Sequence, residues 1–125
     1  MKQLIFVFLG GGLGTVLRFL ISKMVPYHGN GFPWNTFYAN LTGCFIIGII
    51  SGYLIRTQTG NQSDIILFAT VGICGGFTTF STFASENLNF LKSGDYTTFT
   101  VYTFSSIIFG IFMVYAGILL DKHLP

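Results

Sequence analysis

The sequence predicts an all-α integral membrane protein with four transmembrane helices, the third of them broken, assembled as an antiparallel dual-topology homodimer. Hydrophobic residues make up 51% of the chain and charged residues only 8%, whereas soluble domains average about 25% charged residues. The mean hydropathy is +0.68. The apolar residues also form four long runs, separated by short stretches rich in polar residues, glycine or proline.

This composition excludes several classes of protein. Six Lys/Arg and four Asp/Glu residues cannot cover the surface of a soluble 125-residue domain, so a soluble enzyme and a disordered chain are excluded. The net charge of +2 is too small to indicate nucleic acid as a partner. No soluble protein partner is implied, and the lipid bilayer is the expected environment.

The length fits one domain. A membrane-spanning helix needs about 20 apolar residues, so four spans use about 80 of the 125 residues. We therefore expect a single four-helix transmembrane domain over residues 1–125. Its approximate spans are 4–24, 34–55, 65–91 with a break near 75–79, and 97–120.

The connections between the spans are short. The first apolar run is interpreted as a retained helix rather than a signal peptide, because it is long, contains Arg18 and lacks a clear cleavage site. A loop is expected over Pro26–Pro33, a polar loop over Thr57–Ser63 and a turn over Lys92–Asp95.

The positive residues give little preference for one orientation in the membrane. Four spans place both termini on one side, and the positive-inside rule depends on an asymmetry between the two sides. The sequence therefore predicts insertion in both orientations and an antiparallel homodimer, with one dominant orientation as the alternative. Lys2, Arg56 and Lys122 lie on the side of the termini, and Lys23, Lys92 and (by snorkelling) Arg18 on the other.

Glycine pairs at four-residue spacing occur in three of the spans. Small residues at this spacing let helix backbones approach closely in lipid. The pairs are Gly10 and Gly14, Gly48 and Gly52, and Gly72 and Gly76.

The third span contains the most informative segment, Gly72–Phe83 (GICGGFTTFSTF). Adjacent glycines followed by Ser and Thr disfavour a regular helix, because Ser and Thr side chains compete for backbone hydrogen bonds. A break at membrane depth is tolerated only where the backbone is buried in protein or lines an aqueous path. The backbone carbonyls that such a break frees would suit a small cation, and the freed N–H groups would suit an anion. The alternative is a helix that is merely bent.

Several side chains are candidates to contact an anion. Phe80 and Phe83 share a helix face, which Asn87 continues with Glu86 beside it. The positive edges of their rings can hold a small anion, although phenylalanine in a span ordinarily faces lipid or the core.

Asn40 in the second span, one turn after Thr36, either donates to an anion or joins two helices. Arg18 either draws anions toward a vestibule or reaches the lipid headgroups.

The fourth span carries a hydroxyl stripe, Thr98, Tyr102 and Ser106, which can bond across a dimer interface or line a polar track. Cys44 and Cys74 form no CxxC pair and have no histidine at ligand spacing. They are interpreted as small packing residues.

Three motifs, in this order on four short spans, resemble the Fluc (CrcB-type) bacterial fluoride channels over nearly the whole chain. They are Gly11, Gly12 and Gly14 followed by Arg18, the segment Asn35–Gly48 (NTFYANLTGCFIIG), and the segment Gly75–Glu86 (GGFTTFSTFASE).

The resemblance implies a multi-pass protein of the bacterial inner membrane that is not an enzyme. It implies an antiparallel homodimer with two pores, through which cytoplasmic fluoride leaves passively, down its electrochemical gradient. It also implies a structural sodium ion at the dimer centre, held by the backbone carbonyls of Gly75 and Thr78.

The resemblance further implies the residues of the pore. The ring edges of Phe80 and Phe83 line it, Asn40 donates to fluoride, and Arg18 lies in a vestibule. Positions associated with a polar track fall on Ser81, Thr82, Tyr102 and Glu86, and Ser106 of the hydroxyl stripe is assigned to the pore with them.

The sequence leaves two other functions open. A small proton-coupled exporter of the dual-topology multidrug type needs an acid deep in a span, and only Glu86 among the four acids comes near this position. A non-transporting scaffold explains the glycine pairs but not the third span together with Asn40. His28 and His123 lie in a loop and at the C-terminus, without a nucleophile pattern.

Overall fold

The computed structural model describes residues 1–58 and 63–125, and every regular element in these ranges is helical. Residues 59–62 of the expected loop Thr57–Ser63 lie outside the described residues. The elements are α1 (Lys2–Met24), α2 (Trp34–Thr57), α3 (Asp64–Leu67), the π-helical segment η1 (Phe68–Cys74), α4 (Gly75–Phe77), α5 (Phe80–Ser93) and α6 (Tyr96–Asp121).

Four spans are long and apolar enough to cross a membrane, which confirms the predicted four-helix membrane architecture. They are Lys2–Met24, Trp34–Thr57, Asp64–Ser93 and Tyr96–Asp121, so the third span comprises α3, η1, α4 and α5. Large apolar side chains such as Phe8 and Ile111 are 78% and 68% exposed. This outer surface is suited to lipid, as expected when the bilayer replaces water as the solvent.

Local sequence explains where the third span begins and ends. The Ser63 hydroxyl accepts the Ile66 N–H at 3.3 Å and caps α3. At the other end Gly94 has a φ of 76°, a left-handed conformation that ends α5 and that glycine adopts without strain. The Asp95 carboxylate then accepts the Thr98 N–H at 3.0 Å and starts α6.

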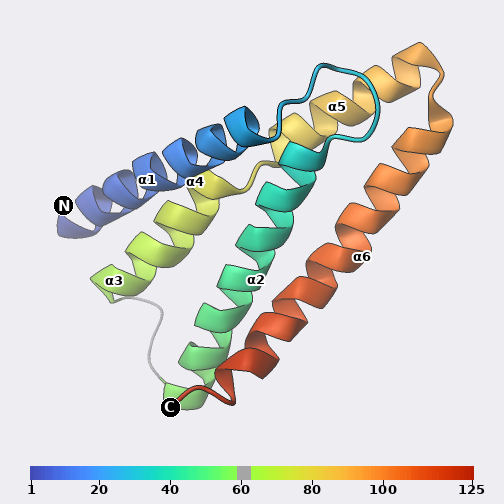
Figure 1. Ribbon diagram of the computed structural model, residues 1–125. Coiled ribbons are helices and arrows are strands. Elements are labelled where there is room, and N and C mark those ends of the chain that lie inside the picture. The colour runs from blue at the N-terminus through green and yellow to red at the C-terminus, as the bar shows by residue number, and fades with distance from the viewer. Residues whose placement is uncertain (59–62) are drawn as a thin grey trace.

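The spans pack as two close pairs (Figure 1). Helix α1 lies along η1 and α4, and α2 lies along α6. Glycines make both contacts tight: a methyl group at Gly10 would meet the Phe68 carbonyl, and one at Gly117 would meet the Phe45 carbonyl. The predicted pair Gly72 and Gly76 faces α1, where it meets the backbone of Gly10 and Gly11.

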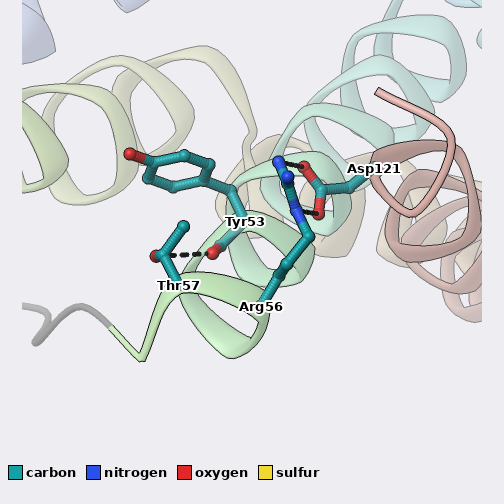
Figure 2. A network of polar contacts seen from close by, with 4 residues as sticks. All are labelled: Tyr53, Arg56, Thr57 and Asp121. Carbon is teal, nitrogen blue, oxygen red and sulfur yellow. Dashed lines mark hydrogen bonds and ion pairs between the residues drawn. The ribbon is translucent and has the colours of Figure 1, made fainter. Parts of the chain in front are cut away.

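An ion pair joins the ends of α2 and α6 near the C-terminus (Figure 2). Arg56 donates from Nε and Nη2 to the two Asp121 oxygens at 3.1 and 3.3 Å. Asp121 is only 2% exposed and lies at the negative end of the α6 dipole, so it needs this cation. The Arg56 guanidinium also lies 5.8 Å from the centre of the Tyr53 ring, and the Thr57 hydroxyl donates to the Tyr53 carbonyl at 2.8 Å.

Candidate functional site

The helix of the third span is interrupted at two threonines. Helix α4 ends at Phe77, Thr78 and Thr79 have extended conformations with ψ of 157° and 111°, and α5 begins at Phe80. The side chains favour this geometry: the Thr78 hydroxyl donates back to the Cys74 carbonyl at 2.9 Å, and the Thr79 hydroxyl accepts the Thr82 N–H at 3.2 Å. Thr79 is therefore the N-cap of α5.

Side chains from two other spans bond to the backbone at the interruption. Asn40 accepts the Thr79 N–H at 2.8 Å and donates to the Thr79 carbonyl at 3.3 Å. In a continuous α-helix the Thr79 N–H would bond to the carbonyl of Gly75, four residues earlier. Asn40 thus diverts this donor and joins α2 to the third span.

Arg18 acts in the same region from α1. Its Nε donates to the Gly76 carbonyl at 3.2 Å, the acceptor that the Phe80 N–H would use in a continuous helix. Arg18 is therefore bonded to the helix end, rather than extended only toward the headgroups.

A groove of about 460 Å³ runs along α2, the third span and α6. It is largely apolar, and its lining includes Phe80 and Phe83, whose ring centres lie 5.9 Å apart. Phe80 is 79% exposed. Among the described residues the buried Ser106 hydroxyl in this groove has no hydrogen-bond partner, so it is available to a ligand.

A second, smaller pocket of about 230 Å³ also adjoins the interruption. Arg18, Asn35 and Thr82 line it, and Thr79 lines both cavities. The buried Asn35 Oδ1 has no hydrogen-bond partner within the described part of the chain. Arg18, the residue that the sequence analysis assigns to a vestibule, is the charged residue of this lining.

A buried carboxylate network lies beyond the groove. Glu86 is 8% exposed and accepts hydrogen bonds from the Thr36 hydroxyl at 2.8 Å and the Tyr102 hydroxyl at 2.7 Å. Tyr27 of the loop before α2 packs on the apolar cluster that contains Tyr102. Burial, together with the negative charges of Glu86 and Asp95, raises the pKa of Tyr27.

The structure thus groups the predicted site residues into three neighbouring places. Asn40, Phe80, Phe83, Ser106, Gly75 and Thr78 line the groove, Arg18 and Thr82 the second pocket, and Glu86 and Tyr102 the carboxylate network. Ser81 is exposed, and its hydroxyl lies 3.4 Å from the Thr79 hydroxyl.

Sequence reasoning missed two residues of this region. The N-cap role of Thr79 was signalled by a threonine directly before a helical run. Thr36 was singled out only as the residue one turn before Asn40, and no sequence signal connects it with Glu86, 50 residues later.

Comparison with known proteins decides the family. The family described as "CrcB-like protein, Camphor Resistance (CrcB)" matches residues 5–118. The chain belongs to the CrcB family. The predicted resemblance is therefore confirmed, and this CrcB-family chain is a multi-pass membrane protein with four membrane-spanning helices.

Curated relatives match this CrcB-family chain over nearly its whole length. A protein of Phocaeicola vulgatus is 45% identical over 98% of this chain and 100% of its own. A Bacteroides fragilis protein is 43% identical over 94% of each chain, and an Aquifex aeolicus protein is 40% identical over 94% of this chain and 95% of its own. All three are named fluoride-specific ion channel FluC, which describes a transporter rather than an enzyme.

Proposed function

We propose that this protein is a passive, fluoride-selective anion channel of the bacterial inner membrane, through which cytoplasmic fluoride leaves down its electrochemical gradient. One observation carries the proposal: in a chain whose near-full-length relatives are named fluoride channels, the third span is interrupted where Asn40 and Arg18 converge on it. A backbone interruption at membrane depth is maintained where it lines an ion path.

The chemistry of the groove suits fluoride. This small anion is strongly hydrated, so a pore has to replace its lost water contacts. The Asn40 amide, the Ser106 hydroxyl and the edges of Phe80 and Phe83 supply several weak donors, with no full positive charge that would hold the ion. Conduction requires sites that bind well enough for entry and weakly enough for exit.

Hydroxyl groups extend this set of donors in both directions. Ser81 and Thr82 lie at the start of α5, where the Ser81 hydroxyl is 3.4 Å from that of Thr79 and Thr82 lines the second pocket with Arg18. We assign to Arg18 the role of drawing anions in. Tyr102 and Glu86 lie beyond Phe83, whose ring centre is 5.0 Å from that of Tyr102. We assign these groups to the polar part of the path.

A second, antiparallel copy of the chain is part of the proposal. The groove is open and Phe80 is 79% exposed, yet extended backbone within a membrane has to be covered by protein or line water. A partner copy provides this cover, and two symmetric copies form two pores. The near-equal numbers of positive residues on the two sides support insertion in both orientations.

We also propose that the dimer holds a structural sodium ion. Gly75 and Thr78 line the groove, and the Thr79 N–H that would occupy the Gly75 carbonyl is bonded to Asn40 instead. Two copies bring four such carbonyls together, and oxygen ligands of this kind suit a small hard cation. The ion would join the two subunits and would not be transported.

Anion efflux from liposomes tests the channel. The purified protein is reconstituted, valinomycin clamps the voltage, and fluoride and chloride electrodes read parallel samples. Fast fluoride release with little chloride release is the expected result. Release that requires a proton gradient, and is lost in Glu86→Gln, would instead establish the proton-coupled exporter.

A further inference from the structure

Two cysteines from facing spans line the same groove. Cys44 lies on α2 and is half-buried, whereas Cys74 ends η1 and is buried. They lie 30 positions apart in the sequence, so only the packing of the spans brings them together.

The register of the two spans explains this proximity. Asn40 bonds to Thr79, and a methyl group at Gly43 would meet the Thr78 side chain. The second and third spans are therefore antiparallel here, and one turn further along α2 corresponds to one turn earlier in the third span. This step places Cys44 at the level of Cys74.

The ligand set of this thiol pair restricts the metal that it can bind. Among the described residues no group of three or more His, Cys, Asp or Glu side chains is positioned to hold a metal ion, whereas structural zinc requires four such ligands. Two sulfur ligands suit a soft cation that prefers linear two-coordination.

Charge restricts the metal further. A monovalent ion such as Ag⁺ between two thiolates leaves a net charge of −1 in an apolar groove, and an unpaired charge at membrane depth is costly. A divalent ion between two thiolates gives a neutral complex.

We propose that Cys44 and Cys74 together bind a soft divalent cation with linear coordination, such as Hg²⁺, and that the bound ion closes the groove to anions. Two S–Hg bonds form, each thiol releases one proton to water, and no redox change occurs. Closure follows because Asn40 and Phe80 line the same groove. This second part rests on the proposed channel function.

Binding is measured on the full-length protein in detergent by titration with Hg²⁺, followed by counting of free thiols and by intact mass. We expect one Hg²⁺ per chain and loss of both thiols. In the wild type the second thiolate binds Hg²⁺ intramolecularly, which strengthens binding. Cys44→Ser and Cys74→Ser each lose this second ligand and should bind Hg²⁺ about 100-fold more weakly than the wild type in competition with glutathione. Methylmercury, which takes a single thiolate, is the matched control and should label each cysteine separately.

Several outcomes overturn the site. Wild-type affinity in either single variant would mean that one thiol binds alone. A mercury-linked dimer would mean that the ion joins two chains instead of two cysteines of one chain.

Fluoride efflux from liposomes tests the closure. We expect Hg²⁺ to stop wild-type efflux, a dithiol to restore it, and the Cys44→Ser/Cys74→Ser double variant to conduct in the presence of Hg²⁺. Stoichiometric binding with undiminished efflux would refute closure. An absence of efflux before Hg²⁺ is added would refute the channel, while the thiol count would still decide the metal site.

Discussion

The Asn40 side-chain amide is bonded to both backbone polar groups of Thr79, accepting its N–H at 2.8 Å and donating to its carbonyl at 3.3 Å. One side chain from α2 thereby satisfies both backbone groups of Thr79, one of the two residues that separate α4 from α5. A buried polar group left without a partner costs about 1–3 kcal/mol, and the cost persists where water is excluded. Asn40 is thus a structural support of the interruption as well as a candidate ligand of the anion.

Asn40→Asp separates these two roles. Aspartate keeps the acceptor for the Thr79 N–H, loses the donor to its carbonyl, and adds a negative charge to the proposed anion path. We expect fluoride efflux to be blocked while the protein still folds, whereas Asn40→Ala should lower the free energy of unfolding by about 2 kcal/mol. Efflux and thermal unfolding in detergent are the measurements. The exposed Asn89 supplies the control, Asn89→Asp, and normal conduction in Asn40→Asp would leave Asn40 with the structural role alone.

Phe80→Ile and Phe83→Ile test the ring edges. Isoleucine keeps apolar bulk but removes the positive ring edge, so each variant should lower fluoride efflux by about tenfold or more, equivalent to about 1.4 kcal/mol of lost stabilisation. Phe80 is 79% exposed, so its variant should fold normally. Phe83→Ile should also be less stable, because Phe83 packs on Tyr102. Phe104→Ile, on the 60% exposed Phe104 of α6, is the matched control, and wild-type efflux in both test variants would refute this role.

The Arg56–Asp121 pair should respond asymmetrically to substitution (Figure 2). Arg56→Met leaves the carboxylate of Asp121, 2% exposed, without its cation, and a buried acceptor left without its partner costs about 1–3 kcal/mol, or more when it is charged. Asp121→Asn removes the partner of Arg56 instead. The Arg56 side chain is 39% exposed and can reach water, so the decrease in the free energy of unfolding should be smaller. A double-mutant cycle of unfolding free energies measures the coupling. Equal losses in the two single variants would contradict this account.

The stability of the first turn of α6 should depend on pH through Asp95. Its hydrogen bonds with Thr98 hold the pKa of the carboxyl below its usual value. A carboxyl group whose pKa is lower in the folded state stabilises the fold at any pH above its unfolded-state pKa. This stabilisation is lost as the pH falls through the folded-state pKa, which for Asp95 means below about pH 4. The protection of the Thr98 amide against hydrogen exchange, taken relative to its intrinsic exchange rate at the same pH, should therefore fall at low pH in the wild type. Asp95→Asn keeps a capping oxygen that does not titrate, so the protection of Thr98 in this variant should not fall in this way.

The sequence by itself determined the four-span membrane architecture, because the length of an apolar run decides whether a helix crosses a bilayer. The family followed from the resemblance of three motifs to the CrcB-type channels. The sequence also predicted a break near residues 75–79 of the third span, since two glycines and two threonines separated by one phenylalanine disfavour a helix wherever they occur. These properties are local and can be read from neighbouring residues.

Only the tertiary structure decided which polar groups satisfy one another. Arg18 bonds to Gly76, Thr36 to Glu86, and Arg56 to Asp121, across separations of 58, 50 and 65 residues. No periodicity in a sequence encodes such pairs, because they depend on the register in which separate spans pack. The same register brings Cys44 and Cys74, which the sequence analysis interpreted as packing residues, to one groove, where we propose a metal site. Polar groups at membrane depth have no water to bond, and their partners are therefore fixed by how the helices pack.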